Sequence, residues 1–268
     1  MDVKVQNDMT EIIHGKVYDY PTYYDIIFAA DWRKEFAFLE ACFDEYATGQ
    51  VQRLFEPACG TGRLLIKLAQ AGYDVSGNDL NPKAVEFCNR RLERRGFEPT
   101  AMVGDMADFR LPKKVDAAFN LINSFRHLPN EQSATAHLQC VARALRKGGL
   151  YLLGLHLTPT DLRICDAECY SARRGNVGVQ SRLWTMSIDS KQRVEMVGMM
   201  LDVTTPTRKL KLVDEMPFRM YNARQFRQLL ARVPELELLE TYDFDLDIDA
   251  PVEVDGRSED VIFVLRKQ

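Results

Sequence analysis

Apolar runs alternate with amphipathic segments along the first 157 residues of the chain. Short apolar runs bounded by turn residues, which are typical of strands, occupy residues 51–55, 74–79, 99–105, 115–122 and 150–157. Apolar positions at helical spacing occupy residues 31–48, 64–73, 81–96 and 130–149. Because strands that alternate with helices form parallel sheets, the pattern predicts an α/β fold with helices on the faces of the sheet.

The pattern changes after His156. Residues 157–177 are expected to form a loop with a short helix. Strand-like runs separated by turn-forming gaps follow at residues 177–189, 191–205 and 209–221, and they predict an antiparallel meander. Another helix and two strands are expected at residues 223–233, 235–245 and 260–267.

This order of elements indicates one α/β domain with an antiparallel β insertion after its fifth strand. We expect an N-terminal helical cap, an α/β core, the insertion and the C-terminal part of the core at residues 1–48, 49–157, 158–221 and 222–268.

The charge balance argues against a dedicated nucleic-acid binder. The 268 residues carry a formal net charge of −4, whereas such binders are usually basic. No run approaches the ~18 apolar residues of a membrane span, and the N-terminal residues lack an apolar signal core. We therefore expect a cytoplasmic protein without membrane contact.

The cysteine spacing predicts reduced thiols and no metal site. No CxxC pair occurs among the six cysteines, and Cys165 and Cys169 lie four positions apart without a second ligand pair.

The most specific motif runs from Glu56 to Arg63 with the sequence EPACGTGR, between a predicted strand and a predicted helix. Glycines there let the backbone approach a ligand, and the helix start offers free N–H groups. A dinucleotide motif needs a third glycine where this chain has Leu65, so NAD is not expected. A nucleoside ligand without a pyrophosphate fits better, and an ordinary turn between strand and helix is the alternative.

Two further strands are predicted to end in carboxylates. Asp79 follows Asn78 at the end of the second strand, where an acidic residue can accept both hydroxyls of a ribose. Gly104-Asp105-Met106 ends the third strand, where a carboxylate can bind an adenine amino group and a methionine can cover its ring. With Glu56 after the first strand, three successive strands are predicted to end in acidic residues. The carboxyl ends of the strands are where open α/β sheets bind ligands, so these residues indicate a ligand site.

These motifs together resemble those of the class I S-adenosylmethionine-dependent methyltransferases. Lys147-Gly148-Gly149-Leu150 is similar to their entry into the fifth strand, and Tyr24-Asp25, followed by Asp31 and Glu35, resembles the small-molecule branch. The resemblance covers residues 20–157 well and the remainder loosely. It implies a Rossmann-like, seven-stranded, mostly parallel sheet, and in similar enzymes the insertion forms a lid or the surface of a homodimer.

The resemblance also implies a set of cofactor contacts. Asp79 would hold the ribose, Asp105 and Met106 the adenine, and the glycine loop would pass beneath the methionine part. Tyr24 would lie over the methionine end, while Glu56 and Asn120 would serve the amino group. The implied S-adenosylmethionine-binding residues, whose product would be S-adenosylhomocysteine, are Tyr24, Glu56, Ala58, Gly60, Gly62, Asp79, Leu80, Asp105, Met106 and Asn120.

His127 is the candidate catalytic residue, because residues 123–128 follow the fourth strand where a methyl acceptor should bind. It can act as a base, as a hydrogen-bonding group that orients the acceptor, or as a packing residue, and the sequence leaves all three open. Residues 120–123 read Asn-Leu-Ile-Asn, which departs from the Asn-Pro-Pro-Tyr motif of enzymes that methylate base or glutamine amides.

The other histidines and the N-terminal aromatic residues carry weaker signals. We expect His14 in a mobile N-terminal segment, His137 on a helix surface, and His156 near the functional edge of the sheet. An aromatic set could line an active-site lid or form core, and comprises Tyr18, Tyr20, Tyr23, Tyr24 and Trp32.

The predicted activity is in-line methyl transfer to a small-molecule amine or hydroxyl, such as an amino sugar, with no metal required. Two alternatives remain open. One is a cofactor-binding protein without transferase activity. The other is a tRNA wobble-uridine methyltransferase, which the net negative charge disfavours.

Overall fold

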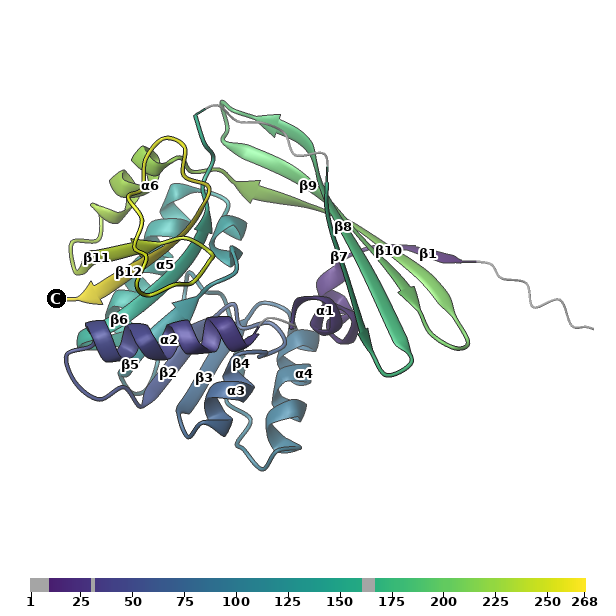
Figure 1. Cartoon of the computed structure of the whole chain (residues 1–268), viewed down its shortest axis with the longest axis horizontal. Coiled ribbons are helices and arrows are strands. Elements are labelled where there is room, and N and C mark those ends of the chain that lie inside the picture. Colours follow the sequence, from purple (N-terminus) through teal and green to yellow (C-terminus); the bar gives the residue numbers. More distant parts are fainter. Residues whose placement is uncertain (1–9, 30–31, 161–166) are drawn as a thin grey trace, which may run out of the picture.

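The computed structural model describes residues 10–29, 32–160 and 167–268. Asp31 and Cys165, both named above, lie outside the described residues. The larger of two sheets has the strand order β11-β12-β6-β5-β2-β3-β4, and β12 runs antiparallel to both of its neighbours (Figure 1). Its strands are β2 (Arg53–Pro57), β3 (Asp74–Asp79), β4 (Ala101–Val103), β5 (Val115–Asn120), β6 (Leu145–His156), β11 (Leu236–Tyr242) and β12 (Asp260–Lys267). The predicted seven-stranded, mostly parallel sheet is confirmed.

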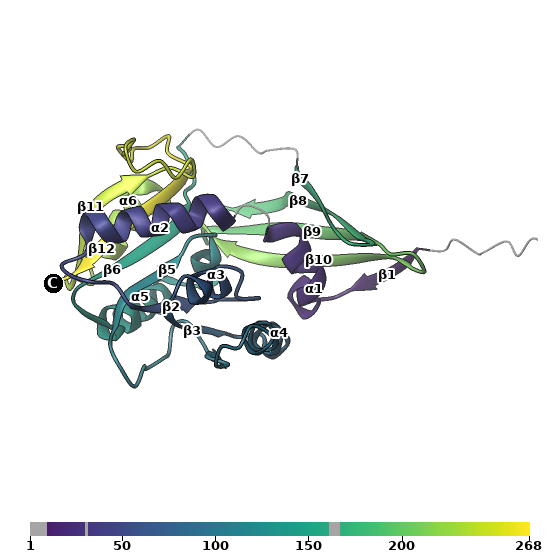
Figure 2. The ribbon, with the colours of Figure 1, turned by 60° about the horizontal axis from the view of Figure 1, so that its bottom comes forward.

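Helices cover both faces of this sheet, as Figure 2 shows. Alternating strand residues divide between the faces, so that Leu54 packs with one apolar cluster and Phe55 with the other. The Leu54 side is covered by α2 (Trp32–Tyr46), α3 (Leu65–Gln70) and α4 (Pro82–Glu93). The Phe55 side is covered by α5 (Glu131–Ala144) and α6 (Ala223–Leu230).

Helix α5 ends earlier than the predicted 130–149. Leu145 already has extended backbone angles and pairs with Val115, so β6 begins there. The pairing between β5 and β6 shifts register just afterwards. Gly148 there has a φ of +75°, and a Cβ on Gly149 would lie 2.8 Å from the Asp116 carbonyl oxygen. These two glycines therefore allow the irregular backbone within β6, and they do not mark the end of α5.

The second sheet is the insertion with one N-terminal strand added. Its order is β1-β10-β9-β8-β7, and the meander predicted for residues 177–221 is confirmed. Its strands are β1 (Glu11–His14), β7 (Glu168–Arg174), β8 (Val177–Asp189), β9 (Val194–Thr204) and β10 (Lys209–Arg219).

Two expectations about this sheet were wrong. Residues 168–174 form strand β7 rather than loop or helix, and they give no alternating apolar signal because both faces of this edge strand are largely exposed. His14 ends strand β1, parallel to β10 and paired with Val213, instead of lying in a loose terminus. Residues 1–48 therefore contain a strand as well as helices.

The segment η1 (Val17–Asp19) and α1 (Pro21–Phe28) lies between the two sheets (Figure 1). Val17, Ile26 and Ile27 are buried against apolar residues of the second sheet, including Met199 and Leu201. In contrast, α2 packs on the large sheet. The N-terminal residues thus connect the insertion to the core.

No helix in the described parts of the chain combines the length and apolarity needed to cross a membrane.

Candidate active site

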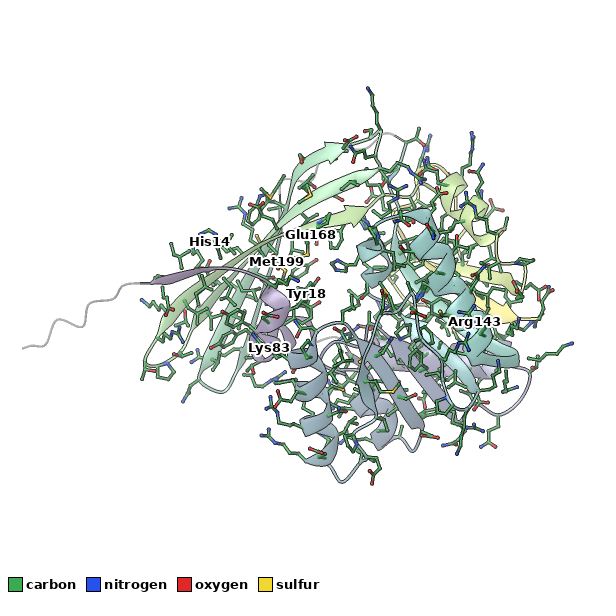
Figure 3. All side chains as sticks on the ribbon, turned by 180° about the vertical axis from the view of Figure 1, so that it is seen from behind. His14, Tyr18, Lys83, Arg143, Glu168 and Met199 are labelled. Atoms are coloured by element: carbon green, nitrogen blue, oxygen red, sulfur yellow. The ribbon has the colours of Figure 1, made fainter. Side chains whose placement is uncertain are left out.

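A cleft of about 1480 Å³ lies between the carboxyl ends of β2 to β6 and the second sheet. Strand β2 leads through α3 to β3, whereas its neighbour β5 leads through α5 to β6 on the opposite side. This point of divergence is where open α/β sheets bind ligands. In Figure 3, Tyr18 and Met199 lie on the side of the second sheet that faces the core. Candidate residues that line the cleft are Tyr24, Ala58, Gly60, Asp79, Leu80, Met106 and His127.

The glycine-rich loop uses its two glycines differently. Gly60 has a φ of +53°, and a Cβ built on it would meet open space, so it borders the cleft. Gly62 has a φ of +66°, but a Cβ there would lie 2.2 Å from Cys88 Sγ on α4. Gly62 is therefore required for packing against α4, and it does not line the cleft. Ala58, at a φ of +54°, opens the same turn.

Asp79 holds this loop in place. Its Oδ2 accepts a hydrogen bond from the Gly60 N–H at 2.8 Å, and its Oδ1 accepts one from the Asn81 N–H at 2.8 Å. Burial raises the pKa of this carboxyl, and the two N–H donors counteract that rise. Leu80 follows with 67 % of its surface exposed, which leaves an apolar side chain at the cleft wall.

The end of the third core strand contributes Met106 rather than Asp105. Met106 is buried and lines the cleft beside Gly104. The Asp105 side chain is exposed, lies outside the cleft lining, and accepts a hydrogen bond from the Ala107 N–H at 2.8 Å. The predicted adenine contact through Asp105 therefore has less support than the contact through Met106.

Two buried acceptors near the ends of β2 and β5 have no donor among the described residues. They are Glu56 Oε2 and Asn120 Oδ1, and neither residue is part of the cleft lining. Burial raises the pKa of Glu56 well above its usual value, although the positive charge of Arg63 opposes the shift. The Asn120 amide donates to the Pro57 carbonyl at 2.7 Å, which joins the two strand ends. An unpaired buried acceptor is costly, so such atoms favour a ligand that brings donors.

His127 lies at the acceptor side of the cleft in a largely apolar setting. Its Nε2 is 3.0 Å from the Tyr18 hydroxyl oxygen, and its ring packs edge-on against Phe218 at 4.8 Å between centroids. Burial, assisted by the neighbouring Arg126, lowers its pKa to about 4. The imidazole is therefore neutral at physiological pH.

Tyr24 and Tyr18 form the cleft wall next to His127. Their rings lie 5.2 Å apart, and burial raises the pKa of Tyr24 to about 12 and that of Tyr18 well above its usual value, so both remain phenols. The sequence placed Tyr18 only in a general aromatic set, because its contact with His127 spans more than a hundred residues of chain.

Arg126 is a cleft residue that the sequence did not indicate. It is 4 % exposed, donates from Nη2 to Glu195 Oε2 at 2.6 Å, and donates from Nε to the Arg219 carbonyl at 3.0 Å. Both partners belong to the second sheet. This ion pair fixes the loop after β5 against the insertion.

The expectation that His137 lies on a helix surface was wrong. Its side chain is fully buried, with Nδ1 2.9 Å from the Met106 carbonyl oxygen and Nε2 2.7 Å from the Tyr151 hydroxyl. Burial lowers its pKa to about 4. His137 thus fixes the backbone at Met106 from behind the cleft.

His156 lies at the cleft, as its position at the end of β6 predicted. Its Nδ1 is 2.6 Å from Asp260 Oδ1, and this hydrogen bond raises its pKa. Among the described residues, no group of three or more His, Cys, Asp or Glu side chains is arranged to hold a metal ion. Independence from metal stays a prediction.

Comparison with known proteins finds a family match in the core. Residues 55–149 match the family described as "Methyltransferase domain". A dTDP-3-amino-3,4,6-trideoxy-alpha-D-glucopyranose N,N-dimethyltransferase from Streptomyces venezuelae is 26 % identical over 148 residues, which cover 54 % of this chain and 58 % of that relative. The alignment thus spans little more than half the length of that relative.

Solved structures of similar fold cover nearly the whole chain. One is a S-adenosylmethionine-dependent methyltransferase from Clostridium acetobutylicum ATCC 824, with a TM-score of 0.75, 16 % identity, and coverage of 92 % of this chain and 97 % of that one. Another is S-adenosylmethionine-bound CalS10, an amino pentose methyltransferase from Micromonospora echinaspora, with a TM-score of 0.70, 19 % identity, and coverage of 97 % and 100 %. Residues 55–149 thus match the methyltransferase-domain family, and the chain as a whole shares the fold of these S-adenosylmethionine-dependent methyltransferases.

Proposed function

We propose that this chain transfers a methyl group from S-adenosylmethionine to an amine nitrogen of a small polar molecule. The observation that carries the proposal is the continuous cleft of about 1480 Å³ shared by the core and the second sheet. Pockets for one small ligand usually measure about 300–1,000 Å³, so this cleft has room for a cofactor and an acceptor together.

The chain's own residues fit this cofactor. Glu56 Oε2 and Asn120 Oδ1 are buried acceptors outside the cleft lining, and an ordered water between them and a cofactor amino group would satisfy them. Asp79 retains lone pairs for ribose hydroxyls after accepting two backbone hydrogen bonds, because each carboxylate oxygen accepts more than one. Leu80 and Met106 offer apolar surface for an adenine, and Gly60 lets the backbone approach the ligand closely. When bound, the cofactor supplies an electrophilic methyl group on a sulfonium.

The acceptor side favours an amine over a hydroxyl. An amine that arrives as an ammonium must release a proton to solvent before it attacks, but its neutral form is accessible near neutral pH, whereas a hydroxyl needs a base held at the site with a pKa near the working pH. His127, with a pKa of about 4, is a poor base at neutral pH but a good neutral hydrogen-bonding partner. We therefore assign His127 the orienting role, fixed by Tyr18 and Phe218.

The names of similar proteins support a sugar-like acceptor. The Streptomyces venezuelae relative is named for methylation of an amino sugar nucleotide, and CalS10 is named an amino pentose methyltransferase. The cleft also mixes the charged residues Glu168 and Arg126 with apolar residues of the second sheet, which suits a polar molecule with an apolar face.

A paired-substrate assay tests this proposal. The purified chain is incubated with S-adenosylmethionine and matched sugars that carry either an amino or a hydroxyl group at one position, and both the methylated sugar and S-adenosylhomocysteine are measured by mass spectrometry. We expect N-methylated product from amino sugars. Transfer to hydroxyl sugars alone would contradict the choice of amine, and RNA methylation without sugar methylation would contradict the small-molecule class.

A further inference from the structure

Asp25 of α1 joins four segments of the chain at one fully buried carboxylate. The Thr61 hydroxyl donates to Oδ1 at 2.8 Å, and Arg91 Nη1 donates to the same oxygen at 2.5 Å. Arg174 Nη1 donates to Oδ2 at 2.7 Å, and its Nη2 donates to the Asp25 carbonyl at 3.2 Å. Thr61 belongs to the glycine-rich loop, Arg91 to α4 and Arg174 to β7.

These contacts hold the glycine-rich loop, here called the cofactor loop, at the residue next to the one that Asp79 holds. Gly60 donates to Asp79, while the next residue, Thr61, donates to Asp25, and the Thr61 carbonyl accepts from Arg91 at 3.1 Å. The loop is therefore fixed between two carboxylates that lie on different segments of the chain. A loop held in its binding geometry loses less freedom when a ligand binds, so such contacts increase affinity.

Arg174 carries this restraint to the insertion. It is the last residue of β7, the edge strand of the second sheet, and its side chain is 53 % exposed, whereas the Asp25 side chain is 0 % exposed. Removing Asp25 would leave Arg91 without its carboxylate partner in a partly buried position, and the fold would suffer. Removing Arg174 leaves Asp25 paired with Arg91 and Thr61, so its effect reports on the link itself.

We propose that Asp25 is a positioning residue for the cofactor loop and that Arg174 couples the placement of the insertion to cofactor affinity. This inference rests on the proposed function, because it takes the ligand of the loop to be S-adenosylmethionine. The insertion then influences cofactor binding as well as enclosing the acceptor.

The test is calorimetric titration of S-adenosylhomocysteine into the full chain, four single variants and one double variant. Arg174→Ala should bind roughly 5- to 20-fold more weakly, at the lower end of the range for coupling between sites. Arg174→Lys should recover part of the loss, because it keeps a charge and one donor. The matched control is Arg173→Ala on the same strand, whose Nε donates only to the Gly175 carbonyl of its own hairpin in the described contacts, and it should bind like the unmodified chain.

A second part of the experiment uses Thr61→Val. It removes the hydroxyl that connects the loop to Asp25, so the losses in Thr61→Val and Arg174→Ala should be less than additive in the double variant. Equal affinities for Arg174→Ala and Arg173→Ala, or fully additive losses, would overturn the inference while leaving the proposed function intact. Failure of the unmodified chain to bind S-adenosylhomocysteine would overturn both.

Discussion

Asp79 connects the cofactor loop to the end of β3, and it is the residue on which ligand binding should depend most. We predict that Asp79→Ala weakens S-adenosylhomocysteine binding by about 1.5–3 kcal/mol, the value of a hydrogen bond to a charged group. Asp74→Ala, at the exposed start of the same strand, is the matched control and should bind normally. Equal affinity of the two variants in calorimetry would remove Asp79 from the site.

Substitutions of His127 distinguish between its two possible chemical roles toward the acceptor, orienting group and base. For an orienting group, His127→Ala should lower kcat about 2- to 15-fold, and His127→Asn should stay near normal, because an amide retains hydrogen bonding. His14→Ala, on strand β1, controls for unspecific effects. Losses of roughly 10²–10⁴-fold in both Ala and Asn variants would assign the base role instead.

His137 makes stability depend on pH. Its pKa is about 4 in the folded chain and about 6.5 when unfolded, so the unfolded state binds more protons between these values. The stabilisation is complete above pH 6.5 and is lost as the pH falls toward 4. We predict that His137 lowers the free energy of unfolding by about 2 kcal/mol when the pH falls from 7.5 to 5.

Urea unfolding at both pH values measures this contribution. His137→Gln can bond to the Met106 carbonyl and the Tyr151 hydroxyl without titrating, so its unfolding free energy should change less with pH than that of the unmodified chain. An identical pH dependence in both proteins would show that His137 titrates normally in the folded state.

At the scale of elements, the turn between β2 and α3 predicts different costs at its two glycines. Gly62→Ala adds a Cβ that collides with Cys88 Sγ at a positive φ, so it should lower the free energy of unfolding by about 2–4 kcal/mol. Gly60→Ala adds a Cβ in open space, so only the strain of its positive φ should lower the free energy of unfolding, by about 1–2 kcal/mol.

Urea unfolding compares the two variants, and Cys88→Ala in the Gly62→Ala background provides the check. Removing the sulfur should recover part of the stability, because it clears the collision. A larger loss at Gly60 than at Gly62, or no recovery, would mean that the turn relaxes in a way this structure does not show.

Local signals explain why the core elements could be predicted. Asn81 accepts hydrogen bonds from the backbone N–H groups of Lys83 and Ala84, and Pro82 opens α4, so the start of that helix is determined within a few residues. In contrast, β1 and β7 are edge strands whose exposed faces carry no alternating pattern. Strand β7 pairs with the next strand, β8, across a short turn, whereas β1 pairs with β10, where Glu11 lies opposite Leu210. The pairing of β1 is therefore a property of tertiary structure.

The same distinction applies to the site. Gly60, Asp79 and Met106 follow from motifs at strand ends, because the edge of a parallel sheet brings those ends together. Tyr18, Arg126 and Asp25 act through partners 36 to 149 residues away, such as His127, Glu195 and Arg174. Such pairings leave no spacing in the sequence from which they could be predicted.

At the scale of the whole molecule, the two sheets and the segment between them form one site. The core supplies the edge of parallel strands, the second sheet supplies Glu195 and Phe218, and the N-terminal segment supplies Tyr18 and Tyr24. A ligand in the cleft therefore contacts parts of the chain that are distant in sequence. Binding should stabilise the fold as a unit.

Calorimetric titration of the purified chain with S-adenosylhomocysteine and, separately, with NAD measures the central claim most directly. The strand-end acceptors and the absent third glycine predict saturable binding of S-adenosylhomocysteine at one site per chain and no binding of NAD. Tight binding of NAD together with no binding of S-adenosylhomocysteine would contradict the assignment of this cleft.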